Sequence, residues 1–296
     1  MLGLELDDAR AIAVRVDDHG GVQARASVAA KGDLAAAAAA ALDHVTPPGA
    51  DPGALGVAAT VPDAPAIAPV LAALSRRFAG PFSTSGAVAS GTAAAIAEVW
   101  VGAARGVQDA VFFAVDDHTT GGIVRGGAPM IGTRGRAASV AWLALNPVER
   151  EDYRKIGCLE AEVAAAGIVR RLIWRIKSGD RSRVSDAVDG DFSAITVRQV
   201  LDGARKGDGV SISVIRDTAK YLGMAAANLV VVADPEMLVL GGIMATAADL
   251  LLDPLRTEIT RRLPKPMMDA LTIRTALLGE DAAAIGAARL VIVAAR

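Results

Sequence analysis

The stretch VFFAVDDHTTGGIVRGG (residues 111–127) places two apolar segments on either side of a polar turn. This order predicts a strand, a turn that contains Asp116, Asp117 and His118, and a second strand. The start of the chain repeats the arrangement in LELDDARAIAVRV (residues 4–16), where the turn is acidic again. The repeat indicates a weak internal duplication, with one strand–turn–strand unit beginning each half of the chain.

The composition predicts a globular protein with a sizeable core. The chain has 296 residues, of which 52% are hydrophobic and 3% aromatic, a net charge of −2 and a single cysteine, Cys158. This length suits one large or two medium domains. Because the charges balance, neither nucleic acid nor an anionic membrane is expected as a partner. The single cysteine, the start without a basic signal region and the lack of a long apolar run predict a cytoplasmic protein.

Strands and helices alternate along the chain, which is typical of the α/β class. In the second half, helical spacing predicts helices over residues 160–177, 196–206 and 215–228. The run LVVVAD (residues 229–234) is rich in β-branched residues and predicts a strand directly after the third helix. A second buried strand is expected over residues 236–242, before further helices that extend to the C-terminal end.

Five segments of the chain resemble one protein family, and they occur in the family's order and spacing. They are GGIVRGGAPMIG (residues 121–132), GCLE (157–160), LGMAAANLVVVADPEMLVLGG (222–242), LLLDPLRTEITRRL (250–263) and LLGEDAAAIGAARL (277–290). They resemble the ROK family of sugar kinases and sugar-responsive repressors, within the actin-like ATPase superfamily. The resemblance implies a homodimer with a two-lobed, ribonuclease H-like α/β fold of the ROK/hexokinase type. Residues 1–118 with 281–296 are expected to form one lobe, and residues 119–280 the other.

The phosphate-binding turns of the family are replaced by acidic residues. The family's first turn is Asp-Ile-Gly-Gly-Thr, and the matching residues here are Glu5, Leu6, Asp7, Asp8 and Ala9. Its second turn, Gly-Thr-Gly, is matched by Asp116, Asp117 and His118. Glycine lets the backbone approach phosphate closely, whereas a carboxylate 4 Å from a phosphate charge costs about 4 kcal/mol at an effective dielectric near 20. ATP is therefore not expected to bind in the family's usual way.

The catalytic base of the family is also missing. The resemblance places Ser90 where the family has an aspartate that deprotonates the sugar hydroxyl, and residues 78–97 contain no ionisable side chain. A serine cannot act as this base without a base of its own. The former sugar pocket keeps Glu160, but Ser139 and Trp142 replace the family's glutamate and histidine. We expect Trp142 to fill the space that the histidine leaves.

A structural zinc ion is not expected. The family binds zinc with one histidine and three cysteines, and only Cys158 is present here. A lone thiol does not form a structural zinc site. The segment EREDYRK (residues 149–155) replaces the family's cysteine loop, and its charged side chains are expected to be solvated.

Two interpretations of the acidic turns remain open. Aspartate is a common turn residue, and Asp17 and Asp18 occupy an ordinary hairpin loop of the same chain. Alternatively, the acids converge on Mg²⁺ or another divalent cation, or on a transition metal if the histidine takes part. The candidates are Glu5, Asp7, Asp8, Asp63, Asp116, Asp117 and His118. Gly241 and Gly242 resemble the family's adenosine-side turn, although glycine pairs also occur wherever a strand meets a helix closely.

The sequence therefore predicts a degenerate sugar kinase that binds a ligand or serves as a scaffold, with its small-molecule or protein partner left open. One alternative is an ATP-dependent hexose or amino-sugar kinase with an atypical active site. Another is a metal-dependent enzyme that uses the acidic residues. A DNA-binding repressor is not expected, because the chain begins on the first strand and not on a helix-turn-helix.

Overall fold

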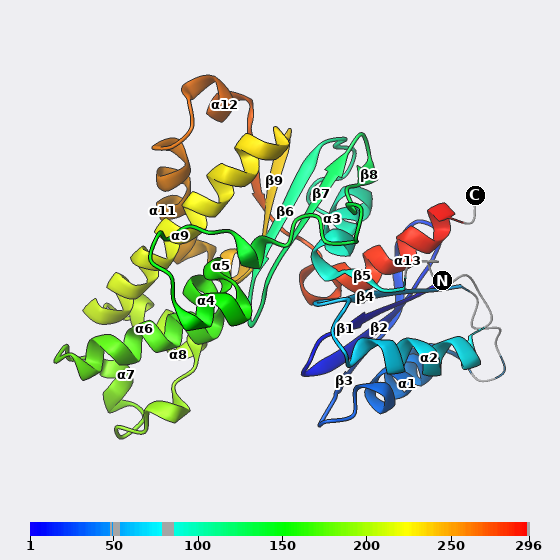
Figure 1. Cartoon of the computed structure of the whole chain (residues 1–296), viewed down its shortest axis with the longest axis horizontal. Coiled ribbons are helices and arrows are strands. Elements are labelled where there is room, and N and C mark those ends of the chain that lie inside the picture. The colour runs from blue at the N-terminus through cyan, green and yellow to red at the C-terminus, as the bar shows by residue number, and fades with distance from the viewer. Residues whose placement is uncertain (48, 50–53, 79–85, 295–296) are drawn as a thin grey trace. The chain divides into compact units, whose positions relative to one another are not determined.

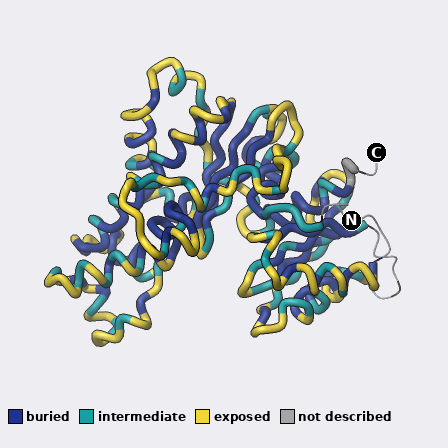
Figure 2. The backbone as a smooth tube through the Cα atoms, in the orientation of Figure 1, coloured by how far each residue is buried: buried dark blue, intermediate teal, exposed yellow. Residues whose placement is uncertain are grey.

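The chain forms two compact units in a computed structural model that describes residues 1–47, 49, 54–78 and 86–294 (Figure 1). The first unit contains Met1–Phe112, Gly121–Ala138 and Ala276–Arg296, and the second contains Phe113–Thr120 and Ser139–Thr275. The sequence-based division differs in three places: it assigned residues 113–118 to the first lobe and residues 121–138 to the second, and it began the returning segment at residue 281. The inner strands of both sheets are mostly buried, whereas the edge strands and many helix and loop residues are partly or fully exposed (Figure 2).

The first sheet has the strand order β3-β2-β1-β4-β5. The strands are β1 (Leu2–Leu6), β2 (Arg10–Val16), β3 (Val22–Ala29), β4 (Leu55–Ala59) and β5 (Val88–Ala89). The first three strands are antiparallel, whereas β1, β4 and β5 run parallel. The acidic stretch at the start of the chain is therefore the tight turn of the β1–β2 hairpin, as predicted.

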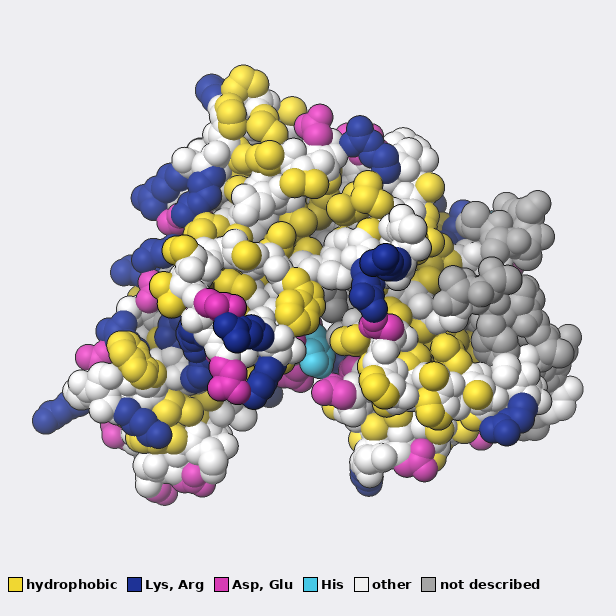
Figure 3. Space-filling view, viewed as in Figure 1, with side chains coloured by type: hydrophobic (Ala, Val, Ile, Leu, Met, Phe, Trp, Pro, Cys, Tyr) yellow, Lys and Arg dark blue, Asp and Glu magenta, His cyan; other side chains and the backbone are white. Residues whose placement is uncertain are grey.

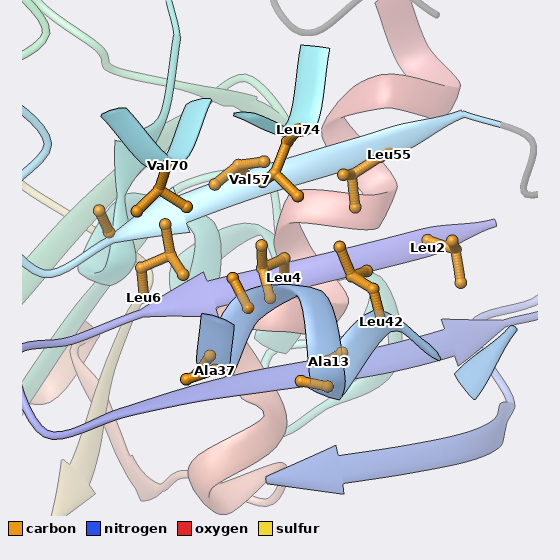
Figure 4. Close-up of a cluster of buried hydrophobic side chains, with 14 of the residues drawn as sticks. Leu2, Leu4, Leu6, Ala13, Ala37, Leu42, Leu55, Val57, Val70 and Leu74 are labelled. Carbon is orange, nitrogen blue, oxygen red and sulfur yellow. The ribbon is translucent and has the colours of Figure 1, made fainter. Parts of the chain in front are cut away.

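One face of this sheet packs against α1 (Leu34–Val45) and α2 (Ile67–Arg77). Alternate residues of β1 point to this face and meet Leu42 and Val70 (Figure 4). The alanine-rich α1 begins directly after Asp33, because the Asp33 side chain accepts a hydrogen bond from the amide of Ala36 (2.9 Å).

The other face of the sheet packs against α13 (Ala282–Ala294), which in turn packs against α3 (Ser90–Val101). Glycines make this close packing possible. An added Cβ at Gly3 or Gly56 would lie 1.9 Å from a carbonyl oxygen of α13, and one at Gly286 would lie 1.7 Å from the carbonyl oxygen of Ala93. Side chains at these positions would force the layers apart.

A buried carboxylate holds the returning segment in the first unit. Glu98, on α3, is 0% exposed and accepts hydrogen bonds from the amides of Ala103 (2.6 Å), Leu277 (3.0 Å) and Leu278 (3.0 Å). These bonds begin before the final helix, which is why the chain rejoins the first unit earlier than the sequence predicted.

The second sheet has the strand order β10-β9-β6-β7-β8. Its strands are β6 (Ala110–Val115), β7 (Thr119–Arg125), β8 (Ala128–Pro129), β9 (Met237–Gly242) and β10 (Thr272–Thr275). The boundary between the units passes through β6 and β7. Residues 121–138 join the first unit because α3 packs directly on β7: a Cβ at Gly91 would lie 2.2 Å from the carbonyl oxygen of Gly121.

The remainder of the second unit is mostly helical. Its helices are α4 (Glu151–Ile156), α5 (Cys158–Val163), α6 (Ala165–Lys177), α7 (Arg183–Asp186), α8 (Val197–Arg205), α9 (Gly209–Ala233), α10 (Ile243–Thr246), α11 (Ala248–Thr260) and α12 (Lys265–Ala270). Short 3-10 helices lie at η1 (Val140–Trp142) and η2 (Phe192–Ala194), and η3 (Gly279–Asp281) precedes the final helix in the first unit. The predicted helix over 196–206 is confirmed as α8, where Thr196 and Gln199 form a capping box.

Two expected elements were wrong. The run 229–234 is not a strand but the last turns of α9, because Leu222, Ala226, Leu229 and Val230 are buried at helical spacing. Packing of this face outweighs the β propensity of the valines, two of which are exposed. The single helix expected over 160–177 is broken at Ala164, whose backbone is extended, so that α6 starts anew beside the 116–118 turn.

Candidate functional site

Asp7 closes the β1–β2 turn with its own carboxylate. Its Oδ1 accepts hydrogen bonds from the amides of Ala9 and Arg10 (both 2.7 Å), and its Oδ2 pairs with the Arg10 guanidinium (3.4 Å). Asp17 closes the next hairpin in the same manner, through the amides of His19 and Gly21 (both 2.9 Å). These bonds support the interpretation of Asp7 as a turn residue. Asp8 is exposed at the tip of the same turn.

Asp7→Ala is expected to lower the free energy of unfolding by about 1–2 kcal/mol, because two turn amides lose their acceptor. Asp7→Asn keeps a side-chain oxygen and should cost less than half as much. Urea unfolding of both variants measures this difference. Equal losses in the two variants would show that the negative charge, and not the turn hydrogen bonds, is what this position supplies.

Glu5, on β1, and Ser90, at the first residue of α3, lie close together in the first unit. Burial of the Glu5 carboxyl raises its pKa from the ordinary value of 4.5 to about 7, and the nearby Ser90 hydroxyl offsets part of this rise. Ser90 is 4% exposed, and its Oγ makes no hydrogen bond of ordinary geometry to the described part of the chain. The sequence did not pair these residues, which are 85 positions apart; the only signal was the placement of both at the family's catalytic turns.

Asp63 forms an ion pair with Arg136, and both side chains are more than half exposed. The pair links the loop after β4 to the loop after β8 within the first unit. The sequence singled out Asp63 as an acid that could join a cation site, but not Arg136, which lies in the segment that the expected division assigned to the other lobe. A guanidinium beside this carboxylate already neutralises its charge.

The second acidic turn, residues 116–118, joins β6 to β7. The amide of Asp116 donates to the carbonyl oxygen of His118 (2.9 Å), and the carbonyl oxygen of Asp116 accepts from the amide of Ala165 at the start of α6 (2.9 Å). Asp117 is exposed. Gly242, with a φ of +62°, lies directly beneath the turn, since an added Cβ would be 2.1 Å from the carbonyl oxygen of Val115.

Glu160, on α5, contacts this turn from the other side. Its Oε2 accepts a hydrogen bond from the amide of Thr119 (2.7 Å), and its Oε1 lies 3.3 Å from Nδ1 of His118. The Glu160 side chain is 12% exposed and that of His118 is 32% exposed. The structure thus brings together two residues that the sequence assigned to different sites, His118 to a phosphate turn and Glu160 to a sugar pocket.

The remaining residues expected in the sugar pocket lie at η1, in the same unit. Ser139 precedes η1 and is exposed, and Trp142 ends it with 56% of its surface exposed. Trp142 is not packed into the core of its unit, and the expectation that it fills the space of the family's histidine stays a prediction. Gly157 holds η1 against α5, because its φ of +95° and the 2.2 Å between an added Cβ and the Ala141 carbonyl oxygen leave no room for a side chain.

The site residues form two groups, one in each unit. Glu5, Asp7, Asp8, Asp63 and Ser90 belong to the first, and Asp116, Asp117, His118, Ser139, Trp142, Glu160, Gly241 and Gly242 belong to the second. Among the described residues, no three His, Cys, Asp or Glu side chains are arranged so that they could hold a metal ion. Gly241 and Gly242 end β9, and the positive φ of Gly242 serves the close approach to β6.

The fold and the order of these turns define an α/β protein of the actin-like ATPase type. The family model for ROK matches residues 55–294, which is most of the chain. The chain therefore belongs to the ROK family, and the resemblance seen in the sequence is confirmed.

The curated relatives of this chain include sugar kinases and DNA-binding regulators. A glucokinase of Halalkalibacterium halodurans is 32% identical over 67% of this chain and 60% of its own length. The DNA-binding transcriptional dual regulator NagC of Escherichia coli strain K12 is 28% identical over 67% of this chain and 47% of its own length. The chain thus spans about half to three-fifths of the length of these relatives.

The fold is that of known ROK sugar kinases. A crystal structure of a ROK family glucokinase from Streptomyces griseus, in complex with glucose and AMPPNP, matches with a TM-score of 0.80. The match covers 98% of both chains at 24% identity. At this identity the similarity establishes the fold, and the predicted α/β actin-like class is confirmed.

The prediction that excluded nucleic acid as a partner is wrong, because relatives of this chain include DNA-binding regulators. The inference rested on the net charge, which averages over the whole chain and does not report on local surfaces or on how a family uses its fold. No helix in the described residues is long and apolar enough to cross a membrane.

Proposed function

We propose that this ROK-family protein keeps the kinase fold without transferring phosphate from ATP to a sugar, and that it serves as a ligand-binding or scaffolding module. The observation that carries the proposal is Ser90, which occupies the start of α3 with a buried hydroxyl where the resemblance places the catalytic aspartate. Loss of a positioned general base typically lowers a rate by 10²–10⁴.

The acidic turns support the same proposal. The Asp7 carboxylate is engaged by the backbone of its own turn, so the negative charge stays where the family's turn presents glycine amides to phosphate. In the second unit, the His118–Glu160 contact adds side chains to a turn that the family builds from small residues. Both features oppose the binding of a polyphosphate.

A second candidate function is an ATP-dependent hexose kinase with an atypical base. One observation favours it: the Glu5 carboxyl lies beside Ser90, and its pKa of about 7 suits a general base at neutral pH. The similarity to glucokinases fits this candidate as well. In this case Glu5, and not residue 90, would accept the proton of the sugar hydroxyl.

Thermal unfolding with and without Mg·ATP tests the proposal. A ligand at one hundred times its Kd stabilises a protein by about 2.7 kcal/mol. We expect millimolar Mg·ATP to shift the Tm no more than Mg²⁺ alone, while a glucokinase relative measured alongside shows a clear shift. A shift with Mg·ATP beyond that with Mg²⁺ would overturn the proposal in favour of the kinase.

A further inference from the structure

Helix α5 carries two glutamates that point to opposite sides. Glu160 and Glu162 are two residues apart, which corresponds to about 200° around a helix. Glu160 contacts the 116–118 turn and the amide of Thr119. Glu162 points into the helical part of the second unit, where it is only 5% exposed.

Three side chains donate hydrogen bonds to the Glu162 carboxylate. Arg150 Nη1 lies 3.1 Å from Oε1, the Tyr153 hydroxyl donates to the same oxygen, and Arg171 Nη2 lies 2.7 Å from Oε2. The same Arg171 nitrogen also donates to the backbone oxygen of Glu162 (2.8 Å). Burial, together with the bond to Glu162, raises the pKa of Tyr153 to about 12, so this phenol remains a donor across the physiological range.

A second carboxylate extends the cluster to the neighbouring helices. Asp152 accepts from Arg150 Nη2 and Arg170 Nη1 (both 2.8 Å), and Arg170 Nη2 donates to the carbonyl oxygen of Ala161 on α5 (2.6 Å). Over α4 and α5, acidic and basic side chains alternate on the surface (Figure 3). Most charged side chains of the segment 149–155 are exposed, as expected, and the segment also supplies the buried Tyr153 on α4, which packs on Cys158.

Helix α5 depends on these contacts for its position. It has six residues and no side-chain N-cap, and a helix of this length is not stable by itself. Its first residue follows Gly157, which packs against η1. A movement of α5 would therefore separate Glu160 from the 116–118 turn. It would also separate α5 from η1, which carries Trp142 and follows Ser139.

We propose that Glu162 is a positioning residue, whose three donors fix α5 so that Glu160 keeps its contacts with Thr119 and His118. Glu162 faces away from the turn and acts on it only through the helix. This role holds whether or not the protein transfers phosphate.

Glu162→Gln tests this role, because it leaves two guanidinium groups facing an uncharged amide. We expect the Tm to fall by about 5–10 °C. We also expect the amide of Thr119 to exchange with solvent at least tenfold faster, and the imidazole signals of His118 to move in NMR spectra. Only three histidines are present, so His118→Gln assigns these signals. Glu149→Gln is the matched control, since the exposed Glu149–Arg154 pair lies in the same segment, and it should change neither readout.

Tyr153→Phe is a milder variant that removes one hydrogen bond, and it carries the test if Glu162→Gln does not fold. It should lower the Tm by a few degrees and speed Thr119 exchange in the same direction. If either variant lowers the Tm but leaves Thr119 exchange and the His118 signals as in the parent, the positioning role is wrong and the cluster is only a local support. An unchanged Tm in both variants would also overturn it.

Discussion

Gly286→Ala should lower the free energy of unfolding by about 3–5 kcal/mol, although alanine is the better helix former. An added Cβ would lie 1.7 Å from the carbonyl oxygen of Ala93 and 2.4 Å from its carbonyl carbon. Both atoms belong to backbone, so no side-chain rotation relieves the clash. Helices α3 and α13 must separate, and α13 is also held closely against β1 and β4 by Gly3 and Gly56.

Gly209→Ala is the matched control for this substitution. Gly209 is the first residue of α9, and nothing lies within 4 Å of an added Cβ there. We expect this variant to be unchanged or stabilised by at most about 1 kcal/mol. Urea unfolding of both variants measures the comparison. If Gly286→Ala is as stable as Gly209→Ala, α13 does not pack against α3 as described.

Glu5→Gln should stabilise the protein at pH 8 by up to about 3 kcal/mol and have little effect at pH 4.5. The pKa of Glu5 is about 7 in the folded protein, against 4.5 ordinarily, so between these values the folded state binds more protons than the unfolded state. The stability of the parent must then fall as the pH rises through this window. Above pH 7 the Glu5 carboxyl is ionised in both states, and the cost of burying its charge lowers the free energy of unfolding by about 3 kcal/mol. Glutamine cannot ionise and removes the penalty.

Urea unfolding at several pH values between 4.5 and 8 tests this prediction. The charged groups around the Glu5 carboxyl are Asp7, Arg10 and Asp281, all in the first unit. Asp17→Asn is the control, because hydrogen bonds from the amides of Gly21 and His19 lower the pKa of that exposed carboxylate. The stability that the Asp17 carboxylate contributes is present above its ordinary pKa and is lost only in stronger acid. Asp17→Asn should therefore leave the dependence of the unfolding free energy on pH unchanged above pH 4.5. A stability difference between Glu5→Gln and the parent that is constant with pH would contradict the burial of this carboxyl.

Much of the fold could be predicted because local chemistry and packing agree. The Asp33 cap, the Thr196 capping box and the two strand–turn–strand units each have a short-range cause that is visible in the sequence. The end of α9 could not be predicted, because its valines prefer strands locally and only the burial of Leu229 and Val230 keeps them helical. Local preference and tertiary packing disagree there, and packing decides.

The candidate site was predicted less well, because its contacts join residues that are distant in sequence. Glu5 and Ser90 are brought together by β1 and α3, and Asp63 is paired with an arginine from the loop after β8. Glu162 gave no signal in the sequence, since a glutamate in a helix is ordinarily solvated. The sequence did show which positions differ from the family's phosphate turns, catalytic aspartate and sugar contacts, and this inference rests on the family resemblance.

The most direct test of the central claim is the formation of ADP from Mg·ATP with glucose as the acceptor, followed with the parent and with Glu5→Gln. We expect no glucose-dependent rate above about 10⁻² s⁻¹, which is far below the 1–100 s⁻¹ that is usual for kinases. A glucose-dependent rate of 1 s⁻¹ or more would contradict the claim. If that rate also fell at least a hundredfold in Glu5→Gln, the protein would be a sugar kinase that uses Glu5 as its base.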